Sequence, residues 1–267
     1  MKAKVVGFIS IKGGVGKTTL SYNVALSLAH DFNKKVLVVD ANFSGPSLSL
    51  YFDISPKFYL QDVFDGKVGV NKAIAEDMSG VDVLPSTLRM GKFDFLKLRQ
   101  YLSSVKFNYD VIIVDSSPSL NEETLSAITA CDEIFVITTP DYVTLAATLY
   151  AVKVARMKMV FIAGLVLNNV RHKKYELDAR EIEKLCGVPV VSVVEHDEEV
   201  IKSLQLGEML AIKKPRRESV VEFKKLAGAL VGEEYRAGGL MSRIKRLFGR
   251  KSQEDINRMV LMHSHYE

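Results

Sequence analysis

The sequence predicts an α/β fold in which a doubly wound, mostly parallel sheet is flanked by helices. Two observations lead to this prediction. Short runs rich in Val and Ile alternate with amphipathic segments at the spacing of βαβ units. The runs are continuously apolar, which is typical of strands that are buried on both faces of a parallel sheet. With 48% hydrophobic and 25% charged residues in a chain of 267, the composition suits one large globular domain.

The elements follow one another in a regular order. Seven apolar runs are expected as strands: Val5–Ser10, Val36–Asp40, Val81–Leu84, Val111–Asp115, Glu133–Thr138, Val160–Leu167 and Val190–Val194. Seven segments with helical periodicity are expected between or after them: Lys17–Ala29, Phe95–Val105, Glu122–Ala130, Val143–Arg156, Glu176–Cys186, Glu198–Leu206 and Ser219–Leu230. We therefore expect one domain over residues 1–231.

A glycine-rich loop, KGGVGKTT, joins the first strand to the first helix. Its glycines allow a tight turn that points backbone N–H groups at phosphate oxygens, and the helix adds the positive end of its dipole. Lys17 is expected to reach the β- and γ-phosphates, and the Thr18 hydroxyl to bind Mg²⁺. A turn without a ligand is disfavoured because GKTT directly opens a helix. The nucleotide-binding residues expected here are Lys12, Gly13, Gly14, Val15, Gly16, Lys17, Thr18 and Thr19.

The lysine ahead of the glycines, Lys12, makes the loop resemble the deviant Walker A loop of the MinD/ParA family of P-loop ATPases. In that family this lysine reaches the nucleotide bound by a partner subunit. The resemblance is closest to MinD and covers most of residues 1–231. It implies ATP and Mg²⁺ as cofactors, a homodimer that forms on ATP binding, and a role in spatial positioning such as division-site placement.

Two acidic stretches are similar to further motifs of the family. VLVVDAN, at residues 36–42, resembles its second acidic motif and implies a metal-site and catalytic role for Asp40. VIIVDSSPSL, at residues 111–120, resembles Walker B and implies that Asp115 holds Mg²⁺ through water. The alternative for Asp115 is an ordinary helix-capping or loop acid.

Two later stretches resemble the part of the family site that binds the base. GLVLNN, at residues 164–169, is similar to a strand that ends in an adenine-contacting Asn, which maps to Asn168 with Asn169 beside it. The alternative for this Asn pair is ordinary turn formation. VPVVSVVEHDEEV, at residues 188–200, resembles the next strand and the loop that lines the base.

The second acidic motif departs from the family at Asn42. The family usually carries a second acid there, which helps to position the attacking water, whereas this chain has Asp40-Ala41-Asn42. An Asn accepts a hydrogen bond from water but cannot take a proton, so hydrolysis is expected to be slow. The catalytic residues expected from this comparison are Lys12, Lys17, Asp40 and Asn42.

A basic segment follows the domain. Residues 236–251 hold six basic residues and no acid. Over residues 239–251 the apolar side chains share one helical face, which is typical of a helix lying in a membrane surface and resembles the MinD targeting segment. The expected membrane-contacting residues are Leu240, Met241, Arg243, Ile244, Lys245, Arg246, Leu247 and Phe248. We expect a hinge at residues 232–238 and a cytoplasmic protein that is peripheral on the inner face of the membrane; the alternative is a terminal helix docked on the body.

Other partners and functions stay open. A patch around Pro215 (Lys213, Lys214, Arg216 and Arg217) offers phosphate contacts for a ParA-like ATPase that positions DNA or a large cargo, a less favoured alternative. An ATP-gated scaffold with negligible hydrolysis is a third possibility. A protein partner is expected but not identified. Residues 252–267 match no motif, are expected to be unstructured and have no assigned role.

Overall fold

The computed structural model describes residues 2–89, 91, 93–235 and 252–264. Within these residues one sheet has eight strands in the order β3-β4-β2-β5-β1-β6-β7-β8. Seven of the strands run parallel, and β3 pairs antiparallel with β4 at one edge. The strands are β1 (Lys4–Ile9), β2 (Val36–Ala41), β3 (Ala75–Glu76), β4 (Val81–Leu84), β5 (Val111–Ser116), β6 (Glu133–Thr138), β7 (Phe161–Val170) and β8 (Val190–Glu195).

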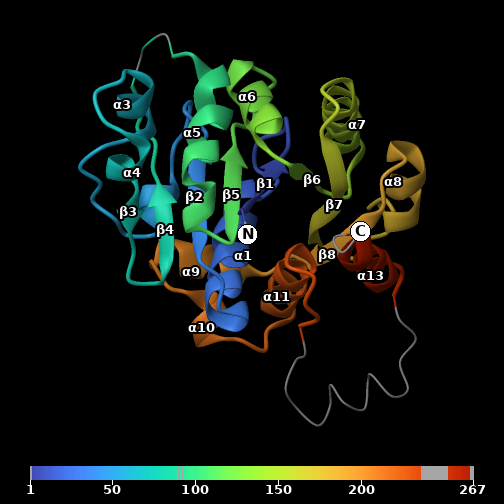
Figure 1. The fold of residues 1–267 in the computed structure, drawn as a ribbon. Coiled ribbons are helices and arrows are strands. Elements are labelled where there is room, and N and C mark those ends of the chain that lie inside the picture. The colour runs from blue at the N-terminus through green and yellow to red at the C-terminus, as the bar shows by residue number, and fades with distance from the viewer. Residues whose placement is uncertain (1, 90, 92, 236–251, 265–267) are drawn as a thin grey trace.

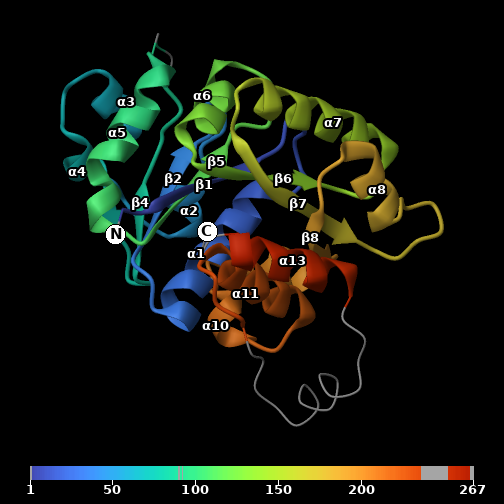
Figure 2. The same cartoon turned by 45° about the vertical axis from the view of Figure 1, so that its right-hand side comes forward.

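Helices cover both faces of the sheet, as Figures 1 and 2 show. One apolar core lies under α3–α8, and a second lies under α1, α2, α9, α10, α11 and α13. The α-helices are α1 (Lys17–Phe32), α2 (Leu48–Tyr51), α3 (Leu60–Phe64), α4 (Val70–Ala73), α5 (Leu98–Val105), α6 (Glu122–Ala130), α7 (Tyr142–Met157), α8 (Ala179–Cys186), α9 (Glu198–Gln205), α10 (Leu210–Lys213), α11 (Glu218–Leu230) and α13 (Gln253–Ser264). Two 3₁₀ turns, η1 (Phe95–Lys97) and η2 (Lys106–Asn108), flank α5.

The predicted α/β fold is confirmed, and every predicted strand and helix is present within three residues of its expected ends. The central strands β1, β2, β5 and β6 are almost wholly buried because both of their faces are covered by helices. The sequence analysis missed the short elements β3, α2, α3, α4 and α10. These have two to five residues, too few for a periodicity to be recognised.

The topology brings several chain segments to one end of the sheet. β5 lies between β1 and β2, and all three run in the same direction, so their carboxyl ends meet. The glycine-rich loop follows β1, Asp40 lies near the end of β2, and Asp115 near the end of β5. In open α/β sheets ligands bind at this end of the strands.

The end of the described chain returns to the body. The expectation that residues 252–267 are unstructured is wrong for the described part, since α13 packs against β8 and α11. Asn257 and Arg258 donate to carbonyl groups of β8, while Leu261 packs in the apolar core. Because its neighbours Ile256 and Val260 are exposed, a search for apolar periodicity could not find this helix.

Residues 232–235, the first part of the expected hinge, also contact the body. Lys34 Nζ lies 2.7 Å from Glu233 Oε1, and the ring centroid of Tyr235 lies 6.3 Å from that of Phe32. A hinge at residues 236–238 and the membrane residues Leu240–Phe248 lie outside the described residues.

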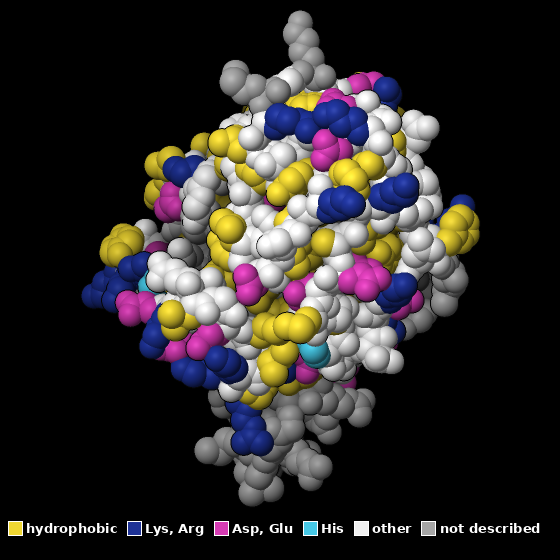
Figure 3. Space-filling view, turned by 90° about the vertical axis from the view of Figure 1, so that its left-hand side faces the viewer, with side chains coloured by type: hydrophobic (Ala, Val, Ile, Leu, Met, Phe, Trp, Pro, Cys, Tyr) yellow, Lys and Arg dark blue, Asp and Glu magenta, His cyan; other side chains and the backbone are white. Residues whose placement is uncertain are grey.

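No helix in the described part of the chain is long and apolar enough to cross a membrane. Figure 3 shows the face at the β3–β4 edge of the sheet, where basic, acidic and apolar side chains are interleaved without a broad area of one charge.

Candidate nucleotide site

The loop between β1 and α1 has a conformation that only glycine adopts easily. Gly14 has φ +79° and Gly16 has φ +93°, both in the left-handed region. A Cβ on Gly16 would also lie 2.2 Å from Nδ2 of Asn168, far inside contact distance. The exposed loop surface at Gly13 and Gly14 is therefore bare backbone, which fits close approach of a phosphate.

Lys17 lies at the start of α1 and is 6% exposed. Its Nζ donates a long hydrogen bond, 3.5 Å, to the carbonyl oxygen of Lys12, and among the described residues it has no carboxylate within ion-pair distance. Burial lowers the pKa of Lys17, and the charge of Asp115 opposes this shift only in part. A buried ammonium in this setting fits an anionic ligand, as a nucleotide phosphate would be.

Thr18 and Asp115, the residues predicted to hold Mg²⁺, lie in direct contact. Thr18 Oγ1 donates to Asp115 Oδ2 at 2.6 Å, and Ser21 Oγ donates to Oδ1 at 3.1 Å. Burial raises the pKa of Asp115 to about 6, against hydrogen bonds from both hydroxyls and the charge of Lys17. The sequence analysis missed Ser21, although its position three residues after Thr18 on α1 places it on the same helix face.

This donor set fits Mg²⁺, a cation that takes oxygen ligands and is usually held by one or two carboxylates together with nucleotide phosphates and water. The described residues contain no cluster of three or more His, Cys, Asp or Glu side chains that would hold a metal without a nucleotide. Thr18 and Asp115 are the residues that would hold Mg²⁺, which supplies charge stabilisation at the phosphates.

Asp40 lies opposite Asp115 in the β2–β5 register and is 1% exposed. Its carboxylate accepts backbone N–H groups from Asn42 (3.1 Å), Ser47 (3.0 Å) and Leu48 (3.1 Å). Burial and the nearby Asp115 raise the pKa of Asp40 to about 7, against these backbone hydrogen bonds. Asp40 therefore holds the loop after β2; its role at the metal stays a prediction.

Asn42 lies at the start of that loop. Its Nδ2 donates to the carbonyl oxygen of Gly45 at 2.7 Å, which fixes the orientation of the amide. Its Oδ1 is buried and has no hydrogen-bond partner among the described residues. An orphaned acceptor of this kind fits an ordered water, the role expected for this position. The next turn of the loop is tied to α6 through Ser44 and Glu123, 2.9 Å apart.

Lys12 lies at the rim of a pocket of about 370 Å³ beside the glycine-rich loop. Its ammonium has no hydrogen-bond or ion-pair partner in the part of the chain that the structure describes. Asp141, the N-cap of α7, also lines this pocket. Burial raises the pKa of Asp141, but hydrogen bonds from Thr139 and Thr144, with a smaller effect of Lys12, leave it below its ordinary value.

The two asparagines at the end of β7 have different contacts. Asn168 Nδ2 donates to the carbonyl oxygen of Val15 at 2.7 Å, so this residue fixes the glycine-rich loop. Asn169 has φ +65°, and its Oδ1 lies 2.6 Å from Nδ1 of His196. Together they link the phosphate loop to the loop after β8. The predicted contact of Asn168 with adenine stays a prediction.

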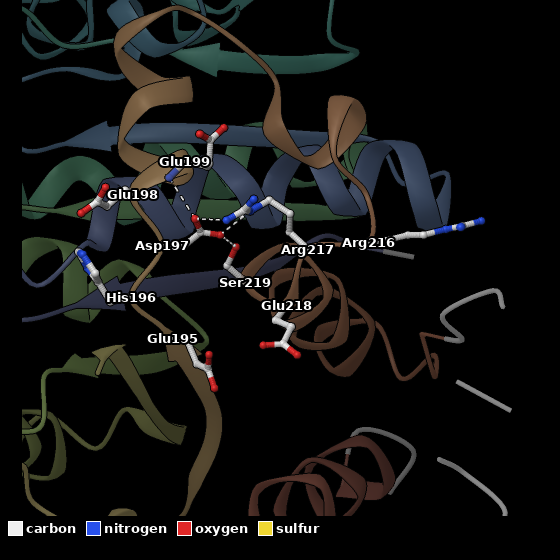
Figure 4. Close-up of a pocket in the computed structure, with 9 residues that line it drawn as sticks. All are labelled: Glu195, His196, Asp197, Glu198, Glu199, Arg216, Arg217, Glu218 and Ser219. Atoms are coloured by element: carbon white, nitrogen blue, oxygen red, sulfur yellow. Dashed lines mark hydrogen bonds and ion pairs between the residues drawn. The ribbon is translucent and has the colours of Figure 1, made fainter. Parts of the chain in front are cut away.

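A larger pocket, of about 770 Å³, lies against the loop after β8 (Figure 4). We call it the base-loop pocket. Its lining residues are Glu195, His196, Asp197, Glu198, Glu199, Arg216, Arg217, Glu218 and Ser219. Sequence analysis indicated residues 195–199 by resemblance but missed the wall from the start of α11.

Asp197 is the structural centre of the base-loop pocket. Its carboxylate accepts hydrogen bonds from Arg217 Nε (2.7 Å) and Nη2 (2.6 Å) and from Ser219 Oγ (2.7 Å). Burial raises the pKa of Asp197, but these bonds and one from the backbone of Glu199 outweigh it and hold the pKa below its usual range. The loop after β8 is thus pinned to the first turn of α11.

Comparison with known proteins agrees with this site. A family model described as an AAA domain matches residues 3–157. An uncharacterized ATP-binding protein of Methanocaldococcus jannaschii is 32% identical over 262 residues, which cover 94% of this chain and 99% of that protein. The septum site-determining protein MinD of Bacillus subtilis is 26% identical over 263 residues, covering 90% of this chain and 96% of that protein.

Solved structures agree as well. The Pyrococcus furiosus cell division ATPase MinD has a TM-score of 0.79 and 29% identity, covering 84% of this chain and 97% of that one. MinD from Pyrococcus horikoshii, solved with Mg-ADP, has a TM-score of 0.79 and 26% identity, covering 84% and 94%. The fold and site define a P-loop ATPase that uses ATP and Mg²⁺. The chain belongs to the MinD/ParA family of these ATPases.

Proposed function

We propose that this chain is a MinD-type switch ATPase that dimerises on binding ATP, attaches to a membrane as a dimer and is released by hydrolysis. The observation that carries the proposal is the position of Lys12: it lies at the rim of the phosphate loop, and its ammonium lacks a partner among the described residues. A second subunit facing this surface would bring its own nucleotide within reach of the lysine. Spatial positioning, such as division-site placement, is the role that the family suggests.

The base-loop pocket is proposed to hold the nucleoside. It lies beside His196, which is linked through Asn169 and Asn168 to the phosphate loop by short hydrogen bonds. A nucleotide whose phosphates lie on the glycine-rich loop would thus extend toward this pocket.

Hydrolysis is proposed to be slow. The position that would orient the attacking water carries Asn42, whose free Oδ1 accepts a hydrogen bond but cannot accept a proton. Positioning and charge stabilisation remain available from Lys17, Thr18 and Asp115. A long-lived ATP state suits a switch; in the limit of negligible turnover it would be a scaffold.

Membrane attachment is proposed to use residues 239–251 on the inner face of the cell membrane. Each basic residue near an anionic leaflet contributes about 1 kcal/mol, so one short segment should bind weakly. Two segments in one dimer gain avidity of roughly 10²–10⁴. ATP binding would thereby control membrane attachment through dimerisation. The attached dimer would then recruit a protein partner.

The DNA alternative receives less support from the basic patch around Pro215. Lys213 pairs with Glu208 at 2.8 Å, and Lys214 with Glu199. Arg217 pairs with Asp197. With three of its four cations neutralised by neighbouring acids, the patch offers little net charge to a phosphate backbone.

Sedimentation with anionic liposomes tests the proposal on the full chain with ATP or ADP and Mg²⁺. Deletion of everything after residue 236 would also remove α13, which packs on β8 of the body. Point variants are therefore preferable. A Leu247→Glu/Phe248→Glu double variant removes the apolar face of the segment. Met78→Glu/Leu88→Glu, at two exposed apolar positions of the body, is the matched control.

The expected result is that the wild type and the control pellet with ATP and much less with ADP, while the segment variant stays soluble. Equal pelleting with ADP would refute the ATP switch. If the wild type never pellets but binds duplex DNA in a salt-sensitive, ATP-dependent manner, the DNA alternative replaces membrane attachment.

A further inference from the structure

Helix α13 is fixed to the body by a buried arginine. Arg258 is 4% exposed, and its Nη1 donates to the carbonyl oxygen of Val191 and to Glu222 Oε2, both at 2.8 Å. Its Nη2 donates to Asp255 of the same helix. A guanidinium keeps its charge when buried, so these acceptors are required where α13 docks.

Glu222 joins three elements at this point. Besides Arg258 of α13, its carboxylate accepts Ser192 Oγ of β8 at 3.2 Å and Lys225 Nζ of its own helix at 2.7 Å. It lies in α11 one turn after Ser219, which holds Asp197. The position of the first turns of α11 is therefore set jointly by α13, β8 and the loop after β8.

Two continuous routes lead from Arg258 to the base-loop pocket. One runs along β8, from the Val191 carbonyl to the loop that begins after Glu195. The other runs through Glu222 and the first turn of α11 to Asp197. Figure 4 shows Asp197, Arg217 and Ser219 meeting among the residues that line the pocket. The two routes converge on this group. Both walls of the pocket thus depend on the elements that Arg258 clamps.

We propose that Arg258 is a positioning residue for the nucleoside part of the bound nucleotide, acting through Glu222 and β8 on the base-loop pocket. The proposal rests on the assignment of that pocket to the nucleoside. It assigns to α13 a function in ligand binding, in addition to covering the edge of the sheet. Because such coupling is reciprocal, a ligand that fills the pocket also stabilises the docking of α13.

The test compares two ligands on the full chain by calorimetry with Mg²⁺: ADP, and pyrophosphate, which has two phosphates and no nucleoside. Arg258→Met keeps an unbranched stem of similar shape but removes the guanidinium with its charge and donors. It is expected to weaken ADP binding about tenfold while leaving pyrophosphate binding unchanged. Arg258→Lys, which keeps a charge beside Glu222, is expected to recover part of the loss.

Leu261→Ala is the matched control, since Leu261 is a buried residue of the same helix that packs in the apolar core. It is expected to lower stability with little change in ADP affinity. Equal weakening of ADP and pyrophosphate by Arg258→Met, equal effects of Arg258→Met and Leu261→Ala on ADP, or no effect on ADP would each overturn the proposal.

Hydrogen exchange on the wild type gives an answer even if Arg258→Met does not fold. ADP is expected to slow exchange of the α13 amides more than pyrophosphate does, and identical protection by both ligands would refute the coupling. If wild-type ADP and pyrophosphate affinities are equal, the assignment of the pocket to the nucleoside fails, which is a separate result from failure of the Arg258 proposal.

Discussion

Asp40 and Asp115 lie side by side across β2 and β5, and burial raises the pKa of both, to about 7 and about 6. Because these values lie above the unfolded value of 3.8, the folded chain binds more protons between pH 4 and 7. In the absence of Mg²⁺ and nucleotide, the contribution of these two groups to the free energy of unfolding is therefore expected to be largest at the low-pH end of this range. It should fall by a few kcal/mol as the pH rises through about 7.

Urea unfolding in EDTA at several pH values measures this effect. Asp115→Asn, which cannot ionise, is expected to flatten the fall and to abolish the stabilisation that Mg²⁺ with ADP gives the wild type at pH 8. Glu254→Gln, on the partly exposed side of α13, is a control that should leave the profile unchanged. A wild-type stability that rises from pH 5 to pH 8 in EDTA would contradict the prediction.

Asn42→Asp is expected to raise ATP turnover by about tenfold, because a carboxylate both orients and polarises the attacking water. The measurement is phosphate release at saturating ATP, with ATP affinity determined separately. Asn42→Ala, which removes the orphaned Oδ1 as well as the bond to Gly45, should be slower than the wild type. Equal rates for the Asp variant and the wild type would exclude a role for this position in hydrolysis.

At this scale, the sequence predicted the residues whose roles depend on local chemistry. The loop from Lys12 to Thr19 and Asp115 lie together as expected because parallel strands end at one edge. Ser21 and the pairing of Asp197 with Arg217 were missed because these roles arise from contacts between distant segments. Neither pattern nor propensity contains that information.

Among the elements, strand β7 packs closely against β8 at Gly164. A Cβ on Gly164 would lie 2.6 and 2.7 Å from the two methyl carbons of Val191 and 3.1 Å from the Pro189 carbonyl oxygen. The pairing of β7 with β8 shifts register close by, between Leu165 and Val166. Gly164→Ala is therefore expected to lower the free energy of unfolding by about 1–3 kcal/mol, measured by urea denaturation.

Gly69 supplies the control for this substitution. It precedes α4 with φ −72°, and a methyl group added to its Cα would meet no residue beyond its chain neighbours within 4 Å. Gly69→Ala should therefore be neutral or slightly stabilising. If Gly164→Ala is as stable as Gly69→Ala, the close approach of β7 and β8 is not a constraint on folding.

Long elements were predictable because their periodicity is carried by many residues. Helix α7 has 16 residues with a buried set that includes Leu145, Val152 and Ala155, and strand β5 is buried at all six positions. α13 was not predictable, because Asn257 and Arg258 dock it on carbonyl groups of β8 and read as ordinary surface residues. β3, with two residues, exists only because β4 offers it an edge.

For the whole molecule, the central prediction concerns the oligomeric state. Lys12→Ala is expected to bind ATP with Mg²⁺ but to remain monomeric, whereas the wild type is expected to dimerise, because in the proposed switch the lysine acts on a nucleotide across the interface. Sedimentation velocity with ATP measures this, and ADP is expected to leave both proteins monomeric.

Lys2→Ala is the matched control, a lysine near the N-terminus that lies over the ring of Phe107. A Lys12→Ala chain that dimerises with ATP as the wild type does would remove the basis of the proposed switch.

The central position of β1 in the sheet has a consequence for biosynthesis. Lys4 pairs with Val111, and Val6 pairs with Glu133, so the strand that carries the nucleotide loop gains its two neighbours only after more than a hundred further residues have been added. Chains are synthesised from the N-terminus at about 5–20 residues per second, and distant pairings form slowly. The phosphate loop is thus synthesised more than a hundred residues before both neighbours of its strand are available. A nascent chain that binds ATP would therefore be one in which β1 has already paired with β5 and β6.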